Sequence, residues 1–414
     1  MGPVALFDKS FLQSLSLDES VWFDNFFIAN VCPLFFVETL ADLDKPPREG
    51  RTPEEQVRVI AQKFPDLHGT PNVFHGTLHY ANLMGYPVPM TGQIMLPQGH
   101  FVSAEGRKAA VHDLSSEVKA FHRWLKGEFH AVEQSYAQAW RSAIACSDLS
   151  AAAETFMSSG ILKEPCTTLE AAKCRSEGAV KAEDDPVLAM KMAISIFGAL
   201  EPVQRRFWKR WTDAACPPLP RYAPYAAYVV TVEAFFQIAV KARLIAPERT
   251  SNRVDISYLF YLPFCQVFIS SDRLHRKCAP LFLRGDQKFI WGNDLKNDLQ
   301  ALNDRYSRLD DETKSRGIMA FACTPPLDAD FLVSRLWDDF LPGWRERNAK
   351  RGLEVPVNQK MTEYFQRMRK ALEAAPMSPD EVDFSPSQAD ILSIKRVVRK
   401  KKGQWWQVPK DMAL

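Results

Sequence analysis

Residues 255–272 read DISYLFYLPFCQVFISSD, a helix-like segment followed by a strand-like one, with an aspartate at each end. Gln266 to Ser270 is a run of β-branched and aromatic residues, which predicts a buried strand. The part before it predicts an apolar helix that begins at Asp255. Asp272 follows the strand directly. A carboxylate in such a setting is costly to desolvate unless a partner compensates its charge, so this stretch predicts part of an acidic site.

The first residues of the chain repeat this combination of a strand and an acid. Residues 3–7 (PVALF) predict a short buried strand that ends at Asp8. Trp22 to Leu43 is an apolar helical region, which Pro33 is expected to divide into two helices, and Glu38 lies within it. Ligands of open α/β sheets bind outside the carboxyl ends of the strands. The four acids of the predicted site are Asp8, Glu38, Asp255 and Asp272.

Each of these acids also has a purely structural interpretation. The three aspartates precede or begin predicted helices, where an aspartate side chain commonly accepts hydrogen bonds as the N-cap. The glutamate could face solvent on an amphipathic helix. No single acid decides between the two interpretations. The prediction depends on the order of the four settings: strand end, helix, helix start, strand end.

This order is similar to that of the PIN domain, a family of metal-dependent nucleases with a parallel sheet flanked by helices. The segments that carry the resemblance are LFDKSFLQSL, FFVETLADL and VDISYLFYLPFCQVFISSDRLH, within residues 1–45 and 222–305. An ordinary PIN domain has a much shorter segment between its second and third acids. The chain therefore resembles a heavily inserted member, and its choice of substrate is open.

The resemblance implies a metal centre with Mg²⁺ or Mn²⁺, both of which prefer oxygen ligands. Asp8, Glu38 and Asp255 would be catalytic metal ligands, and Asp272 would be a further ligand or would lie just behind them. Metal ions held in this way lower the pKa of a bound water, orient it towards a phosphodiester and stabilise the leaving oxygen. The implied reaction is hydrolysis of phosphodiester bonds in RNA or single-stranded nucleic acid.

The expected fold is α/β, with a PIN-like parallel sheet flanked by helices, a large mainly helical insertion and a helical C-terminal extension. Pro46, Pro47 and Gly50 mark a change of composition. The aromatic content of the following block predicts a folded body with its own core, which would wall the acidic cleft. The expected divisions are 1–45 for the first part of the core, 46–221 for the insertion, 222–320 for the second part of the core, and 321–414 for the extension with its basic, tryptophan-containing tail.

Composition and charge exclude several other classes of protein. The chain has 414 residues, a formal net charge of +2 and 8 cysteines without a C-x-x-C pair, which argues against a structural zinc site. It has no P-loop motif. His75 and His79 have the i, i+4 spacing of a metal pair but no companion carboxylate motif. No segment has the roughly 20 apolar residues that span a bilayer, so we expect a cytoplasmic protein that does not contact a membrane.

A nucleic-acid partner would have to bind local basic patches, because the net charge is small. One basic helix pattern, Arg205 to Trp211, is better explained as an amphipathic helix with its aromatic side in the core. The second basic patch is the tail, in which lysines could contact phosphates and tryptophans could stack on bases. The tail could instead pack its tryptophans on the body. The expected substrate-binding residues are Ser270, Ser271, Arg273 and His275 beside the acids, and Lys400, Lys401, Lys402 and Trp405 in the tail.

By analogy with PIN-like proteins, a nuclease of this kind could be a toxin or a defence effector. Two other functions remain open from the sequence. The first is a non-catalytic scaffold for nucleic-acid or protein binding, built on a PIN-like core, although the presence of all four acids argues against it. The second is a metal-dependent DNase of the flap type, which would use the same acids on a different substrate.

Overall fold

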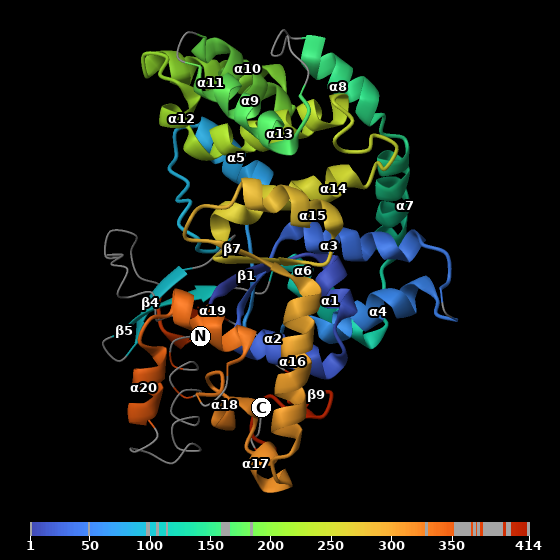
Figure 1. Cartoon of the computed structure of the whole chain (residues 1–414), viewed down its shortest axis with the longest axis vertical. Coiled ribbons are helices and arrows are strands. Elements are labelled where there is room, and N and C mark those ends of the chain that lie inside the picture. The colour runs from blue at the N-terminus through green and yellow to red at the C-terminus, as the bar shows by residue number, and fades with distance from the viewer. Residues whose placement is uncertain are drawn as a thin grey trace.

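The chain folds as an α/β protein around a parallel β-sheet with helices on both sides (Figure 1). Within the described residues this central sheet has five strands, in the order β3-β2-β1-β6-β7, and every neighbouring pair is parallel. The computed structural model describes residues 2–48, 50–96, 100–104, 107–112, 115–158, 166–182, 185–327, 330–351, 392–394 and 399–411, with a few positions between 366 and 375.

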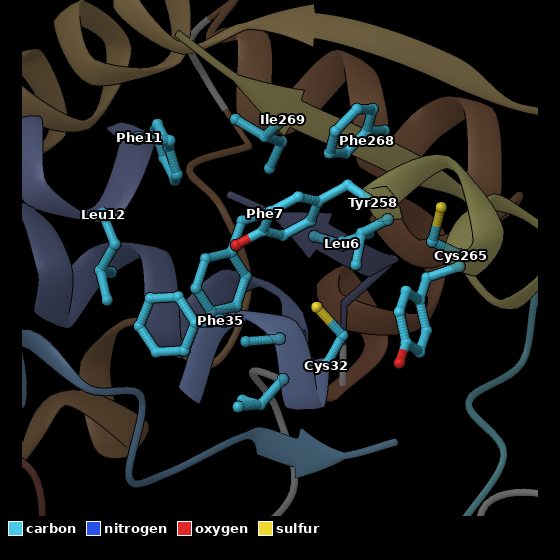
Figure 2. Close-up of a cluster of buried hydrophobic side chains, with 14 of the residues drawn as sticks. Leu6, Phe7, Phe11, Leu12, Cys32, Phe35, Tyr258, Cys265, Phe268 and Ile269 are labelled. Atoms are coloured by element: carbon cyan, nitrogen blue, oxygen red, sulfur yellow. The ribbon is translucent and has the colours of Figure 1, made fainter. Parts of the chain in front are cut away.

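Strands β1 (Val4–Phe7) and β6 (Val267–Ser270), which lie side by side in the sheet, are buried over their whole length, as expected for short apolar runs in a parallel sheet. Leu6 lies beside Phe268, and Phe7 lies beside Ile269. Figure 2 shows these side chains packed with Phe35 in one apolar cluster. The strands of the sheet are β1 (Val4–Phe7), β2 (Ile28–Val31), β3 (Gly69–Pro71), β6 (Val267–Ser270) and β7 (Lys288–Trp291).

Two of these strands differ from the sequence-based expectation. The region expected to form two helices contains β2, between α2 (Leu17–Phe26) and α3 (Pro33–Leu40). A short apolar run has no periodicity that separates a buried strand from a helix. Strand β3 lies inside the range expected for the insertion, and it pairs with β2 through the backbone. The core sheet therefore extends beyond residue 45.

The helices that pack around the sheet come from both ends of the chain. Helix α2 contacts both α4 and α16. Trp22 of α2 stacks on Tyr306 of α16, so the first and second parts of the core are joined by side-chain packing as well as by the sheet. Besides α2 and α3, the helices around the sheet are α1 (Lys9–Ser14), η1 (Ala41–Asp44), α4 (Pro53–Lys63), α6 (Ser116–Lys126), α14 (Asn252–Ser257), η2 (Tyr258–Phe264), α15 (Arg273–Cys278), η3 (Ala279–Leu281) and α16 (Gly292–Ser307).

A second hydrophobic cluster lies in a helical body at one end of the molecule (Figure 1). Phe207 and Trp211 are buried in it, which confirms that this basic helix turns its aromatic side inwards. Helix α13 belongs to both clusters, because Val230 faces the helical body and Phe235 faces the sheet core. The helices here are α5 (His75–Leu83), α8 (Leu149–Ser158), α9 (Leu169–Lys181), α10 (Pro186–Phe197), α11 (Glu201–Asp213), α12 (Leu219–Tyr222) and α13 (Pro224–Lys241).

Helix α7 (Ala131–Ala145) connects these two parts. The amphipathic pattern from residue 110 to 145 predicts one long helix, but the range begins with the end of a strand, β5 (Arg107–His112), and continues as two helices. Gly127 adopts a positive φ of 79° and ends α6. A left-handed residue of this kind is a common helix C-cap, and glycine adopts it without steric cost. The chain then turns, and α7 packs along η1 and α3.

The last part of the chain adds short helices and strands. None of the helices in the described ranges is both long enough and apolar enough to cross a bilayer. Trp337 of α19 donates a hydrogen bond from its indole to the carbonyl of Phe26, which ties this part to the core. The remaining elements are β4 (His100–Ala104), β5 (Arg107–His112), α17 (Asp311–Ser315), α18 (Ile318–Phe321), α19 (Leu332–Phe340), α20 (Trp344–Arg351), β8 (Leu392–Ile394), β9 (Lys401–Lys402) and β10 (Trp405–Trp406).

His79 of α5 should make the fold sensitive to acid. Its Nε2 donates to the carbonyl of Ala193, and its Nδ1 has no hydrogen-bond partner within the described residues. Burial lowers the pKa of His79 to about 4. Because the unfolded chain takes up the proton near pH 6.5 and the folded chain does not, this group destabilises the fold as the pH falls from 6.5 towards 4, by about 2 kcal/mol between pH 7 and pH 5.

Urea unfolding at the two pH values measures this effect. In a His79→Leu variant, the loss of unfolding free energy between pH 7 and pH 5 should be smaller than in the parent by that amount. An equal loss in both proteins would show that His79 does not carry the acid sensitivity.

Candidate active site

The predicted acids lie at the carboxyl edge of the sheet, where the direction of chain connection reverses. The chain passes from β1 to β2 and β3 on one side, and from β6 to β7 on the other. Asp8 follows β1, and Asp272 follows β6, so these two residues flank the point of reversal. In open α/β sheets this is the place where ligands bind.

Asp8 is buried and surrounded by hydrogen-bond donors. Its Oδ1 accepts from the backbone N–H of Phe11, as the N-cap of α1, which is the structural role that its position also predicted. Its Oδ2 accepts from the hydroxyls of Ser10 (2.6 Å) and Ser270 (2.8 Å) and lies 3.4 Å from Nδ1 of His275. Burial raises the pKa of Asp8, but the hydrogen bond and charge of His275 bring it below the ordinary value. Asp8 is therefore ionised.

His275 is the cation behind the acids. Its ring is fully buried, with Nδ1 2.8 Å from Oγ of Ser270 and Nε2 2.6 Å from the backbone carbonyl of Asp255. Burial lowers the pKa of His275, but the hydrogen bond and charge of Asp8 raise it to about 9. A protonated imidazole thus links the ends of β1 and β6 to α14. The expectation that His275 approaches the substrate is corrected, because its ring has no exposed surface.

Asp255 and Glu38 complete the acidic side of this edge. Asp255 lies in the first turn of α14, whose N-cap is Ser251, so Asp255 is not itself the cap. Its Oδ2 is buried without a hydrogen-bond partner among the described residues. Burial raises the pKa of Asp255 to about 7, and the charges of Asp272 and Glu38 contribute in the same direction. Asp255 therefore carries a buried oxygen without a donor at the centre of the acidic cluster.

Glu38 projects from α3 towards η2. Its Oε2 accepts from the hydroxyl of Tyr258, and its backbone carbonyl accepts from Nζ of Lys9 at 3.0 Å. Burial raises the pKa of Glu38, although Lys9 and Tyr258 oppose the shift, and Asp8 adds to it. The pattern predicted either a site residue or a solvent-facing one, and the contact with Tyr258 places the carboxylate in the cluster.

Arg249 lies across the outer side of the acids. Its Nη2 is 3.4 Å from Oδ2 of Asp272 and 3.6 Å from Oδ2 of Asp255. The arginine side chain is 57% exposed, whereas the side chains of Asp255 and Asp272 are 14% and 17% exposed, so the guanidinium covers the carboxylates from the solvent side. Asp272 is also the N-cap of α15, since its Oδ1 accepts from the N–H of Leu274 at 2.6 Å.

These contacts determine how well the site fits a divalent cation. No three His, Cys, Asp or Glu side chains of the described chain have the arrangement of a metal site. Two of the acids instead point part of their carboxylates at protein donors, and Arg249 lies between the other two. The donor chemistry does fit, because the oxygens are of the kind that Mg²⁺ and Mn²⁺ prefer and Oδ2 of Asp255 has no hydrogen-bond donor within the described part of the chain.

The serines and Arg273 expected to bind substrate have different settings. Ser270 is fully buried, and its hydroxyl donates to Asp8 and accepts from the N–H of Asp272, so its role is structural. The Oγ of Ser271 is buried beside β7, where a Cβ on Gly292 would lie 2.1 Å from it. Arg273 is exposed beside Asp272 and is free to meet a ligand from solvent.

The tail does not extend the acidic site. Trp405 is fully buried and packs edge-on against Trp22, and Nζ of Lys402 donates to the carbonyls of Lys63 and Phe64. These two residues are therefore structural, and their expected role in substrate binding is corrected. Lys401 is exposed and lies over the ring of Trp406. Lys400 is half-buried, and residues 395–398 lie outside the described residues.

The tail also lies at the other end of the sheet. Helices α4 and α16 have their carboxyl ends near the amino edge of the strands, and the tail packs against those ends through Phe64 and Asn303. Figure 1 shows β9 and the C-terminus at one end of the molecule, away from α3, α14 and α15. A nucleic acid that reaches the acids does not need the tail.

Three residues of the site were not predicted from the sequence. Lys9 follows Asp8 directly, and Tyr258 lies between two of the acids in sequence, so only their neighbours signalled them. Arg249 comes from a polar connection after α13 that has no motif. Comparisons of the chain with known protein families, with curated proteins and with solved structures gave no match.

Proposed function

We propose that the protein hydrolyses phosphodiester bonds of single-stranded nucleic acid, with RNA as the preferred substrate. The reaction would use Mg²⁺ or Mn²⁺ bound at Asp8, Glu38, Asp255 and Asp272. The observation that carries this proposal is the buried Oδ2 of Asp255, which accepts no hydrogen bond within the described residues, lies 3.6 Å from Nη2 of the exposed Arg249, and has the charges of Asp272 and Glu38 nearby. Buried carboxylates of this kind are paired, protonated or bound to a metal. The place of the cluster, at the reversal of the sheet, supports the same proposal.

A bound divalent cation would supply the charge that lowers the pKa of a water and stabilises the leaving oxygen. Asp255 and Asp272 would offer their oxygens to it when Arg249 moves aside. Arg249 is then positioned to pair with a phosphate oxygen, since an arginine binds carboxylates and phosphates with the same planar donors. Asp8 and Glu38 would complete the ligand set from the back of the site, where four protein donors already hold Asp8 in place.

The direct test is a cleavage assay with the full chain. Labelled single-stranded RNA, single-stranded DNA and flap-containing duplex DNA are each incubated with Mg²⁺, with Mn²⁺ and with a chelator. We expect cleavage of single-stranded RNA that requires the cation. An Asp286→Asn variant is the matched control. Asp286 is exposed and precedes β7, at the edge of the sheet opposite the acids, so this variant should cleave RNA like the parent. Preference for the flap substrate would instead identify a flap-type DNase.

A specific observation also favours a second candidate, a non-catalytic nucleic-acid-binding scaffold. His275 and Arg249 already place two positive groups among the acids, so the cluster is partly neutralised without a metal. A protein of this kind would bind the oligonucleotide with equal affinity in chelator and in Mn²⁺, and no substrate would be cut. That result would reject the nuclease proposal. A role as a toxin or in defence would follow only from a demonstrated RNase activity.

A further inference from the structure

A cavity of about 310 Å³ adjoins the acidic cluster. Glu38 is part of its wall, as are Lys9 from the start of α1 and Val254 from α14. Another part of the wall comes from α7, which lies within the range expected for the insertion. The volume is at the lower end of the range for small-ligand sites. It suits a group the size of one nucleoside, held directly beside the acids.

The wall contributed by α7 is aromatic. Trp140 and Ile144 line the cavity, and Trp140 is half-buried. One helical turn earlier, the ring of Tyr136 lies nearly parallel to that of Trp140, with an angle of 14° and a centroid distance of 6.4 Å. Tyr136 is 45% exposed. The two rings therefore lie in nearly parallel planes, one at the cavity and the other towards the surface, and such aromatic rings are the groups on which successive bases stack.

Two partly exposed basic side chains, Lys45 and Arg141, line the cavity and are each held by an ion pair. Lys45 pairs with Asp42, and Arg141 pairs with Asp44 at 3.3 Å. The side chains of Lys45 and Arg141 are 41% and 38% exposed. The Arg141–Asp44 pair is exposed at both partners, and pairs of this kind contribute little to stability, typically about 0–1 kcal/mol. Asp42 is buried and also pairs with Lys9 at 2.5 Å, so it keeps one cation when Lys45 turns away. A phosphate can therefore replace Asp44 as the partner of Arg141 at low cost, and Lys45 can reach a phosphate while Lys9 still neutralises Asp42.

We propose that this cavity binds the nucleotide next to the scissile phosphate of a single-stranded nucleic acid. The base stacks on Trp140, the neighbouring base stacks on Tyr136, and Arg141 and Lys45 contact the backbone phosphates. The proposal rests on the proposed function for the position of the scissile phosphate at the acids. It assigns to α7 the selection of single strands, because the bases of a duplex are stacked on their neighbours and have no free face to offer the rings.

Binding, separate from cleavage, tests this proposal. The probe is a fluorescein-labelled ten-nucleotide oligouridylate, titrated by anisotropy with Mg²⁺ in an Asp255→Asn background that does not cut it. Trp140→Ala should raise Kd by about 5- to 150-fold, the range for loss of one stacked base. Trp140→Phe keeps a flat ring and should lose less. Arg141→Gln should reduce the slope of log Kd against log salt by about 0.7.

The matched control is Trp208→Ala. Trp208 is also half-buried and also lies on a basic helix, α11, but in the helical body away from the cavity. Its substitution should leave Kd unchanged. Thermal melts of all the variants check the fold, and hydrogen exchange should show protection of the α7 peptide when the oligonucleotide binds.

The two proposals fail in different ways. If the parent protein cuts RNA but Trp140→Ala binds like its background, or if Trp208→Ala weakens binding as much as Trp140→Ala, the assignment of the cavity is overturned and the nuclease proposal stands. If nothing is cut under any condition but Trp140→Ala still weakens binding selectively, the nuclease proposal fails and the binding site stands.

Discussion

Asp255→Asn should abolish cation-dependent cleavage of single-stranded RNA and raise the unfolding temperature measured without metal. The asparagine has nearly the same shape but is a poorer cation ligand. Loss of a group that merely orients a metal ligand already lowers metal affinity or activity by about 10- to 100-fold. We therefore expect a loss of more than about 100-fold in cleavage. In the absence of the cation, the change removes a buried negative charge that lies beside Glu38 and Asp272, so the fold gains stability.

The gain should depend on pH in a defined direction. The folded-state pKa of Asp255 is about 7, above the ordinary value near 4, because burial disfavours the ionised form. The contribution of Asp255 to the free energy of unfolding therefore falls as the pH rises from 4 to 7, by on the order of 3 kcal/mol, and this loss is absent from the variant. Chemical denaturation at pH 5 and pH 8 gives the two differences. Full cleavage by Asp255→Asn would remove this residue from the site, and an equal stability difference at both pH values would remove the buried charge from the explanation.

The strands that the sequence revealed are those with an uninterrupted apolar run before a polar residue. Strands β1 and β6 are of this kind. Strand β2 was missed because its four residues continue the apolar pattern of α2, and only the tertiary pairing with β1 distinguishes them. Strand β3 consists of Gly69, Thr70 and Pro71, whose side chains have no strand pattern. Its place depends on backbone hydrogen bonds to β2, which a single sequence does not display.

The candidate site was predicted in its acids but not in the groups that hold them. The order of the strands brings Asp8 and Asp272 to one edge, and a carboxylate directly after an apolar strand is visible in the sequence. The partners come from elsewhere in the fold, as with Arg249, or have a side-chain direction that only packing determines, as with His275. Clusters of lysine and tryptophan gave the opposite error. A buried Trp405 and an exposed one have the same sequence context, so the tail looked like a binding surface.

The buried imidazole of His275 should be worth most to the fold when Asp8 is ionised. Replacing it by glutamine leaves a polar side chain but removes the positive charge. Asp8, which is only 3% exposed, then stays buried without its cation. Removing one partner of a buried charge pair costs about 3–5 kcal/mol. We expect a loss of this size in the free energy of unfolding of His275→Gln at pH 7. The double variant Asp8→Asn/His275→Gln should lose less than the sum of its single variants, since the unpaired carboxylate is gone.

The pH dependence and the cation response distinguish a charge effect from a loss of packing. The folded-state pKa of His275 is about 9, above the ordinary value of 6.5, so its contribution is complete below pH 6.5 and is lost as the pH rises through 9. The difference between the parent and His275→Gln should therefore shrink at pH 10, whereas a packing defect would persist. Saturating Mn²⁺ should stabilise the variant more than the parent, because a cation among the same acids replaces the missing charge. If Mn²⁺ stabilises neither protein, the acids do not bind it, and His275 alone accounts for the neutralisation of Asp8.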